Sequence, residues 1–221
     1  MKTLNAKDLL FEQVARIGKA MSNPKRLELL ELLSQGEKTV ETLANESHTD
    51  LKLTSAHLKA LKEARLVITR RAGKYIHYRL AGADIANLWL NLRAVAGEHL
   101  IELRLALAKM SSDPSKLVSV SREQLLQQAK NGDVVVIDVR PTTEYQTAHL
   151  PFARSLPLTE LLQRLNELPR DKDIVAYCRG PFCLLSDEAV ELLTARGFHV
   201  RKTLDGVNEW QAAGFPLSVP T

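Results

Sequence analysis

Apolar residues recur every three or four positions through most of the first half of the chain, which is the spacing of one helical face. Four stretches follow this pattern and predict four helices, at 6–21, 23–36, 38–47 and 50–66. The first has the residues Leu9, Leu10, Val14 and Ile17 on one side. In the second, Pro24 stands where a helix begins and Gly36 where it ends.

The period then changes from helical spacing to alternation. Residues 66–80 alternate apolar and polar side chains on both sides of Gly73, which predicts a two-stranded hairpin with its turn at Ala72-Gly73. Apolar residues with helical spacing return from Asp84 to Met110 and predict one long helix.

A short polar stretch, "SSDPSK" at 111–116, separates this half from a different pattern. Beyond it, apolar runs at 133–139, 173–178 and 199–204 predict buried strands, and 159–168, 184–197 and 206–214 predict helices. Buried strands that alternate with helices are typical of a parallel sheet. We therefore expect an α domain at 1–110, a linker at 111–116 and an α/β domain at 117–221.

The composition limits the class of protein. The chain has 221 residues, 45% hydrophobic and 25% charged, as in ordinary globular proteins. No apolar run approaches the roughly 20 residues that cross a bilayer, and the first residues lack the pattern of a secretory signal. Two cysteines cannot form a disulfide scaffold, so we expect a cytoplasmic protein with no membrane partner.

Positive charge is concentrated in the first half. Residues 1–112 hold 18 Lys and Arg against 12 Asp and Glu, whereas residues 113–221 hold 12 against 14. Residues 52–79 contain eight basic side chains and one acid, Glu63. A solvated surface explains scattered lysines, but this concentration favours a nucleic-acid partner.

Three helices followed by a basic hairpin predict a winged helix-turn-helix with a β-hairpin wing. Such a fold places one helix in the major groove while cations of the wing hold phosphates. The predicted DNA-contacting residues are Lys52, Thr54, Ser55, Ala56 and Lys59 on the helix and Arg70, Arg71 and Lys74 on the wing. Leu53, Leu58, Leu61 and Leu66 are expected in the core.

The stretches "NPKRLELLELL" and "LTSAHLKALKEARLVITRRAGKYIHYRLA" resemble the ArsR/SmtB family of bacterial repressors, over about residues 8–109. The resemblance implies a homodimer built on the first and last helices, which a signal releases from operator DNA. Arg65 departs from the family, which commonly has Gly at the end of the recognition helix.

Metal sensing in this half is not expected. The third predicted helix has no Cys, and Asp84 and His99 on the last helix are not part of a paired ligand set. His57 is interpreted as a packing or DNA-proximal residue and His99 as a solvated one. We predict no metal and no cofactor, which places the signal-detecting site elsewhere.

Both cysteines lie in "CRGPFC", directly after an apolar run and before a predicted helix. A strand–loop–helix junction directs backbone N–H groups at one point beside the positive end of a helix dipole. Cys178 should therefore ionise readily, aided by the charge of Arg179, while Gly180 and Pro181 shape the turn. The alternative is that both cysteines only fill the core.

Residues 117–217 resemble the rhodanese domain through "IDVRPTTEYQTAHLPFARSLPL", "IVAYCRGPFCLLSDEAVELLTARGF" and "LDGVNEWQAAGFPL". The resemblance implies that Cys178 accepts a sulfane sulfur in a loop of Cys178, Arg179, Gly180, Pro181, Phe182 and Cys183. It also suggests a structural pair between Arg140 and Glu144, near Asp138 and Tyr145. His149, beside which Ala148 replaces the family's Gly, is expected to have a packing role. Gly206 and Trp210 are expected in the core.

Loop length favours sulfur over phosphate chemistry, because the Cys-x5-Arg type of phosphatase or reductase needs Arg where Leu184 stands. Arsenate reduction is a weaker alternative. Cys183 could attack a persulfide on Cys178 and give a disulfide or polysulfide bridge, or it could simply pack under the following helix.

These features predict a dimeric DNA-binding repressor that senses reactive sulfur through Cys178 and Cys183. Its expected partners are operator DNA, a second copy of the chain, and a sulfane-sulfur donor such as polysulfide, persulfide or thiosulfate. A sulfurtransferase that carries a DNA-binding domain is the main alternative. General oxidant sensing by a Cys178–Cys183 disulfide is a third.

Overall fold

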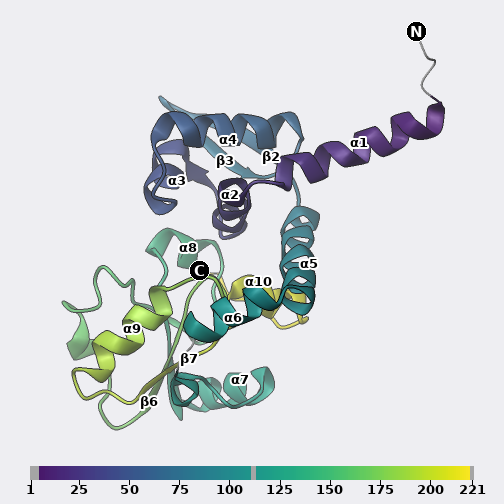
Figure 1. Ribbon diagram of the computed structural model, residues 1–221. Helices are drawn as coiled ribbons and strands as arrows, with labels where there is room; N and C mark the ends of the chain where they lie inside the picture. Colours follow the sequence, from purple (N-terminus) through teal and green to yellow (C-terminus); the bar gives the residue numbers. More distant parts are fainter. Residues whose placement is uncertain (1–4, 111–112, 220–221) are drawn as a thin grey trace. The chain divides into compact units, whose positions relative to one another are not determined.

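A computed structural model describes residues 5–110 and 113–219, which fall into two compact units divided between Asn91 and Leu92. Figure 1 shows a helical first unit with a small sheet and a second unit built on a larger sheet. No helix among the described residues is long and apolar enough to span a bilayer.

The helices of the first unit begin within two residues of their predicted starts, and the first two residues of the third predicted helix, Lys38–Thr39, form a strand instead. Asn23 and Asp50 cap two of them, since their side chains accept hydrogen bonds from the backbone N–H groups of Arg26 and Leu53. The helices are α1 (Ala6–Met21), α2 (Pro24–Ser34), α3 (Val40–Glu46) and α4 (Leu51–Glu63).

The predicted hairpin forms β2 (Val67–Ala72) and β3 (Tyr75–Leu80), and a short strand that was not predicted, β1 (Lys38–Thr39), extends it. The strands are antiparallel in the order β1-β3-β2. Ala72 pairs with Tyr75, so the turn is Gly73-Lys74 and the predicted position, Ala72-Gly73, is wrong by one residue. Gly73 takes a positive φ of 60°, which explains why the turn centres there.

The core of the first unit joins α2, α3, α4 and β2. Leu58, Leu61 and Leu66 are buried in it as predicted. Leu53 is 45% exposed, so its assignment to the core is wrong. Thr54 faces the core instead, because it lies one turn before Leu58 and two before Leu61.

The predicted single helix Asp84–Met110 is two helices, α5 (Ala83–His99) and α6 (Ile101–Met110). They meet at Leu100. Gly97 and His99, poor helix formers, stand immediately before this break. No residue of α6 is fully buried.

The second unit confirms the predicted parallel sheet. Its strands run in the order β5-β4-β6-β7, and every pairing is parallel. They are β4 (Val134–Asp138), β5 (Arg154–Ser155), β6 (Asp173–Tyr177) and β7 (Val200–Lys202).

Helices cover both faces of this sheet. Val135 and Ile137 of β4 pack in a cluster with α9 (Leu185–Thr194), whereas Val134 and Val136 pack in a second cluster with residues of α7 (Arg122–Asn131) and α10 (Val207–Ala212). Because neighbouring residues of β4 face opposite layers, the strand reads as a continuous apolar run.

Two elements of the second unit differ from the predictions. Residues 159–168 form turns and a short 3₁₀ helix, Leu165–Glu167, where a longer helix was predicted; their hydrogen bonds span mostly three residues, and Leu161 anchors the segment in the core. Helix α7 was not predicted, although Ser121 and Gln124 form a capping box at its start and Gly132 ends it.

Part of the predicted linker, residues 111–112, lies outside the described residues. Its remainder includes a 3₁₀ turn at Pro114–Lys116. The linker at 111–116 and the domain limits derived from it stay predictions.

Candidate functional site

Cys178 lies directly after β6, at the carboxyl edge of the parallel sheet, and is 2% exposed. The loop runs from Cys178 to Cys183 and leads into α9, whose N-cap is Leu184. Gly180 takes a positive φ of 135°, a conformation that other residues rarely adopt. The predicted strand–loop–helix junction is therefore present.

The sulfur of Cys178 has polar neighbours on several sides. Its Sγ lies 3.3 Å from Oγ of Ser186, a buried residue in the first turn of α9. The thiol also lies 3.3 Å from the carbonyl oxygen of Cys183 and 3.9 Å from that of Gly180. Sequence reasoning did not single out Ser186, although it is a polar residue within a predicted helix close to the loop.

Two opposing effects set the pKa of Cys178. Burial raises it, but hydrogen bonds from the side chains of Cys183 and Ser186 and from backbone groups of Gly180 and Ser186 outweigh burial and lower the pKa to about 7. A large share of Cys178 is therefore thiolate near neutral pH, without a separate general base. The thiolate is the nucleophilic form of cysteine.

Cys183 differs from Cys178 in its burial and in its pKa. Both thiols are free, and Cys183 is only partly buried. Its hydrogen bond with Cys178, together with burial and the negative charge on Cys178, raises the pKa of Cys183 well above that of an ordinary thiol. Cys183 also packs against the apolar core, so the structure is consistent with both a resolving and a packing role.

The guanidinium of Arg179 is held by Glu144 of α8 (Thr142–Thr147). Nε lies 3.0 Å from both carboxylate oxygens, and Nη2 lies 2.6 Å from one of them. The two side chains are 11% and 1% exposed. Arg179 is therefore a loop-fixing residue whose charge is largely balanced by Glu144.

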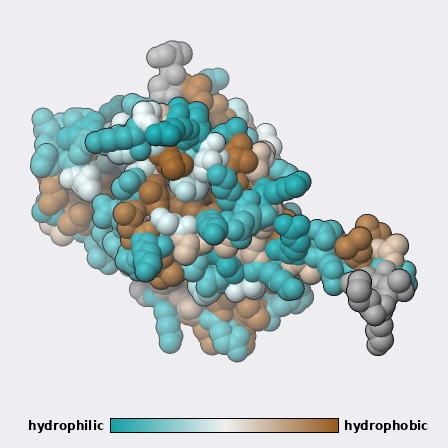
Figure 2. Space-filling model, turned by 90° about the horizontal axis from the view of Figure 1, so that it is seen from above, coloured by the Kyte–Doolittle hydropathy of each residue, from teal (hydrophilic) through white to brown (hydrophobic). Residues whose placement is uncertain are grey.

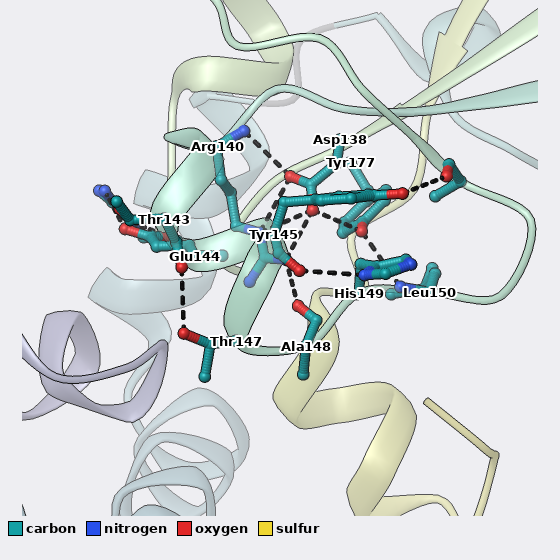
Figure 3. A network of polar contacts seen from close by, with 12 residues as sticks. Asp138, Arg140, Thr143, Glu144, Tyr145, Thr147, Ala148, His149, Leu150 and Tyr177 are labelled. Atoms are coloured by element: carbon teal, nitrogen blue, oxygen red, sulfur yellow. Dashed lines mark hydrogen bonds and ion pairs between the residues drawn. The ribbon is translucent and has the colours of Figure 1, made fainter. Parts of the chain in front are cut away.

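A second buried network lies beside this pair (Figure 3). Arg140 donates to both carboxylate oxygens of Asp138, with the shortest contact at 2.6 Å, and to the carbonyl of Ala148. The hydroxyl of Tyr177 donates to Asp138 at 2.6 Å and accepts from the N–H of Leu150. The network ties the ends of β4 and β6, the strands that carry the site.

Arg140 stays charged in this setting. Burial alone would lower its pKa, but hydrogen bonds and the charge of Asp138 raise the pKa above its usual value, and Glu144 contributes in the same direction. The predicted direct Arg140–Glu144 pair remains a prediction, because the hydrogen bonds described above join Arg140 to Asp138 and Glu144 to Arg179.

Gly206 packs against the loop backbone. A Cβ at this position would lie 2.6 Å from the carbonyl oxygen of Arg179 and 2.7 Å from that of Cys178. Next to it, Glu209 accepts a hydrogen bond from the Gly206 N–H at 2.8 Å, and a Cβ on Gly180 would lie 3.0 Å from its carboxylate. The sequence predicts only a core role for Gly206. In the structure, its lack of a side chain lets the loop backbone approach closely, which its position in the sequence did not reveal.

Two other predicted residues are structural. The ring of His149 stacks on that of Tyr145 at 3.8 Å, and its Nδ1 lies 3.0 Å from the carbonyl oxygen of Tyr145. Trp210 is 1% exposed in the apolar cluster. Both agree with the packing roles predicted for them.

In the first unit, most predicted DNA-contacting residues are accessible. Lys52, Ser55, Ala56 and Lys59 are exposed on α4. Thr54 is fully buried, and its hydroxyl donates to the carbonyl of Asp50 at 2.9 Å. The prediction that Thr54 contacts DNA is therefore wrong, because its side chain belongs to the core face of the helix.

The wing residues Arg70, Arg71 and Lys74 are all exposed. Arg70 pairs with Glu37, with 2.5 Å between Nη2 and Oε1, and this hydrogen bond lowers the pKa of Glu37 despite some burial. Arg65 follows α4 with a φ of 62°. This left-handed conformation is the one that glycine commonly supplies at the end of a helix, so the sequence departure falls on a strained position.

Two family models match separate parts of the chain. The model of the family described as bacterial regulatory protein, arsR family, matches residues 23–69, and that of the rhodanese-like domain matches residues 121–213.

One relative covers nearly the whole chain. The HTH-type transcriptional regulator Rv0324 of Mycobacterium tuberculosis is 43% identical over 96% of this chain and 92% of its own length. A sulfurtransferase of Allochromatium vinosum is 31% identical over 46% of this chain and 94% of its own length. A solution structure of a homodimeric winged helix-turn-helix domain from Mycobacterium bovis is 44% identical over 46% of this chain and 94% of that one, with a TM-score of 0.42.

Proposed function

Because the chain belongs to the ArsR family of bacterial transcriptional regulators and carries a rhodanese-like domain, we propose that it represses transcription and senses reactive sulfur at Cys178. The observation that carries the sensing proposal is the environment of this thiol. Cys178 is buried, has its pKa lowered to about 7, and lies beside Cys183, which is held as a thiol. A purely structural cysteine has no need of this combination.

The first chemical step is a sulfur transfer. The Cys178 thiolate attacks the outer sulfur of a persulfide donor, a new S–S bond forms at Sγ, the S–S bond of the donor breaks, and the donor's thiolate leaves with the electron pair. Atoms and charge balance: Cys178–S⁻ and R–S–SH give Cys178–S–SH and RS⁻.

In the second step, Cys183 converts the persulfide on Cys178 into a disulfide. Its sulfur attacks Sγ of the persulfide on Cys178, so that a Cys178–Cys183 disulfide forms and the outer sulfur leaves as hydrogen sulfide. The donor supplies the oxidising equivalent, and no further oxidant is required. The product crosslinks the two ends of a loop that Gly206 and Glu144 otherwise hold in one conformation.

The DNA-binding role rests on the first unit. The exposed face of α4 carries Lys52, Ser55, Ala56 and Lys59, and the wing adds Arg70, Arg71 and Lys74. Small and basic side chains on a helix that can enter the major groove suit contacts with base edges. The cations of the wing beside it suit contacts with phosphates.

The proposed assembly is a homodimer. Helix α1 exposes Leu9, Leu10, Phe11 and Val14, which are 50–71% accessible, and Figure 2 shows apolar atoms on the surface of this helix at the right of the view. Helix α5 exposes Leu88, Leu92 and Val95. Apolar faces of this kind are normally covered by another surface, and a second copy is the partner that the family resemblance implies.

A sulfurtransferase enzyme is the second candidate. The observation that favours it is the same thiol, together with the similarity to a protein named sulfurtransferase. An enzyme must transfer the outer sulfur of its Cys178 persulfide to an acceptor at each turnover. In the proposed sensor, the persulfide stays on Cys178 until Cys183 reacts with it.

Intact mass after treatment with polysulfide separates these possibilities. The wild type should lose about 2 Da as the disulfide forms, and Cys183→Ser should gain about 32 Da per sulfur atom, since its persulfide has no resolving thiol. Cys178→Ser should remain unchanged. Rapid turnover of thiosulfate and cyanide, undiminished in Cys183→Ser, would instead support the enzyme and contradict the switch.

A further inference from the structure

The charges around the loop from Cys178 to Cys183, here called the sulfur loop, indicate which class of sulfur donor it takes. Cationic side chains that contact the loop or the first turn of the helix that follows it are paired with carboxylates. Arg179 is paired with Glu144, Arg93 with Glu209, and Lys202 with Asp187. The positive charge that would attract an anionic donor is therefore already balanced.

The helix after the loop adds negative charge. The first turn of α9 contains Asp187 and Glu188, and Glu188 is exposed. Carboxylates in the first turn occupy the positive end of the helix dipole, which would otherwise favour a bound anion. Together with the three pairs, Glu188 leaves this group of side chains with a net negative charge.

The loop surface is also apolar where a donor must approach. Pro181 and Phe182 are half-buried, Leu184 is 50% exposed, and Cys178 itself is 2% exposed. A sulfonate group brought against these side chains would lose water without gaining an unpaired cation, and such desolvation is unfavourable. The protonated –S–SH form of a hydropersulfide, which is the form that a thiolate attacks, carries no such penalty.

We propose that the loop takes sulfur from hydropersulfides and discriminates against thiosulfate, with the buried Glu144–Arg179 pair as the determinant. This inference rests on the proposed function, since it names the donor of the same site. With a hydropersulfide, Cys178 gains the outer sulfur and the donor's thiolate leaves. With thiosulfate the leaving group would be sulfite, and a dianion would have to approach the negatively charged loop.

The test measures the rate at which Cys178 becomes persulfidated, by mass spectrometry in the Cys183→Ser protein, with cysteine persulfide prepared in situ or with thiosulfate. Thiosulfate should react more slowly by about a hundredfold, since each like-charge contact lowers the local concentration of an anion. Added salt should speed the thiosulfate reaction by screening that repulsion and leave the hydropersulfide rate nearly unchanged.

Variants locate the determinant. In the same Cys183→Ser protein, Glu144→Gln should raise the thiosulfate rate by about tenfold, because it removes a negative charge and releases Arg179. Glu191→Gln, on an exposed residue two turns along α9, is the matched control and should change neither rate. Thermal unfolding checks that Glu144→Gln folds. If it does not, Glu188→Gln removes a negative charge near the loop from an exposed position, and it should raise the thiosulfate rate by a smaller factor.

The outcomes are distinct from those that test the switch. Equal rates with both donors, or a thiosulfate rate that falls with salt, would overturn the donor preference and leave sulfur sensing intact. If neither donor modifies Cys178, the proposed function itself fails.

Discussion

The hydroxyl oxygen of Ser186 lies 3.3 Å from the sulfur of Cys178, inside a region where both residues are 2% exposed. A hydrogen bond to a buried thiolate stabilises the charged form more than the same bond in water. Ser186 therefore connects the first turn of α9 to the reactivity of the loop.

Replacing Ser186 by Ala should raise the pKa of Cys178 from about 7 toward that of an ordinary thiol. The thiolate fraction at pH 7 then falls, by about tenfold for a full unit. The pH dependence of iodoacetamide labelling at Cys178, read by peptide mass, measures the shift. Ser119→Ala, at an exposed position, should leave the midpoint near 7; an unchanged midpoint in Ser186→Ala would remove Ser186 from the account.

Gly206→Ala should destabilise the second unit or displace the loop. The added Cβ would lie 2.6 Å from backbone atoms of Arg179, which cannot move as a flexible side-chain end could. Urea unfolding should show a loss of about 1–3 kcal/mol. Gly97→Ala is the control, because a Cβ there meets nothing within 4 Å in a helix, and it should be neutral or slightly stabilising. Equal stability of the two variants would contradict the close approach.

Arg65→Gly should stabilise the first unit. Arg65 holds a φ of 62° after α4, and glycine adopts this conformation without the steric cost of a Cβ. The expected gain is about 1 kcal/mol in the free energy of unfolding. Arg65→Ala separates strain from charge, since it removes the guanidinium but keeps the Cβ, and it should give no gain.

Arg71→Ala should weaken operator binding at every sequence and reduce the dependence of affinity on salt. A phosphate contact contributes about one unit to the slope of log affinity against log salt. Lys130→Ala, an exposed basic residue of α7, is the matched control and should not alter the slope. Identical slopes for both variants would place the DNA contact away from the wing.

The sequence was sufficient to predict the winged helix-turn-helix, the parallel sheet and the position of Cys178, because periodicity and loop spacing are local properties. It did not identify the partner of Arg179, since Glu144 stands 35 positions earlier and only the fold brings the two together. Thr54 was a different kind of error. Its spacing to Leu58 and Leu61 already indicates the buried face, but its residue type suggested a DNA contact.

Operator affinity before and after persulfide treatment, measured by gel shift for the wild type and Cys178→Ser, tests the central claim most directly. The sensing account predicts that treatment weakens wild-type binding by about 5- to 150-fold, the usual range of coupling between two sites. Cys178→Ser should bind the operator equally well with and without treatment. If the wild type also binds equally well in both states while its Cys178 is fully modified, the sulfur loop does not control the DNA-binding unit.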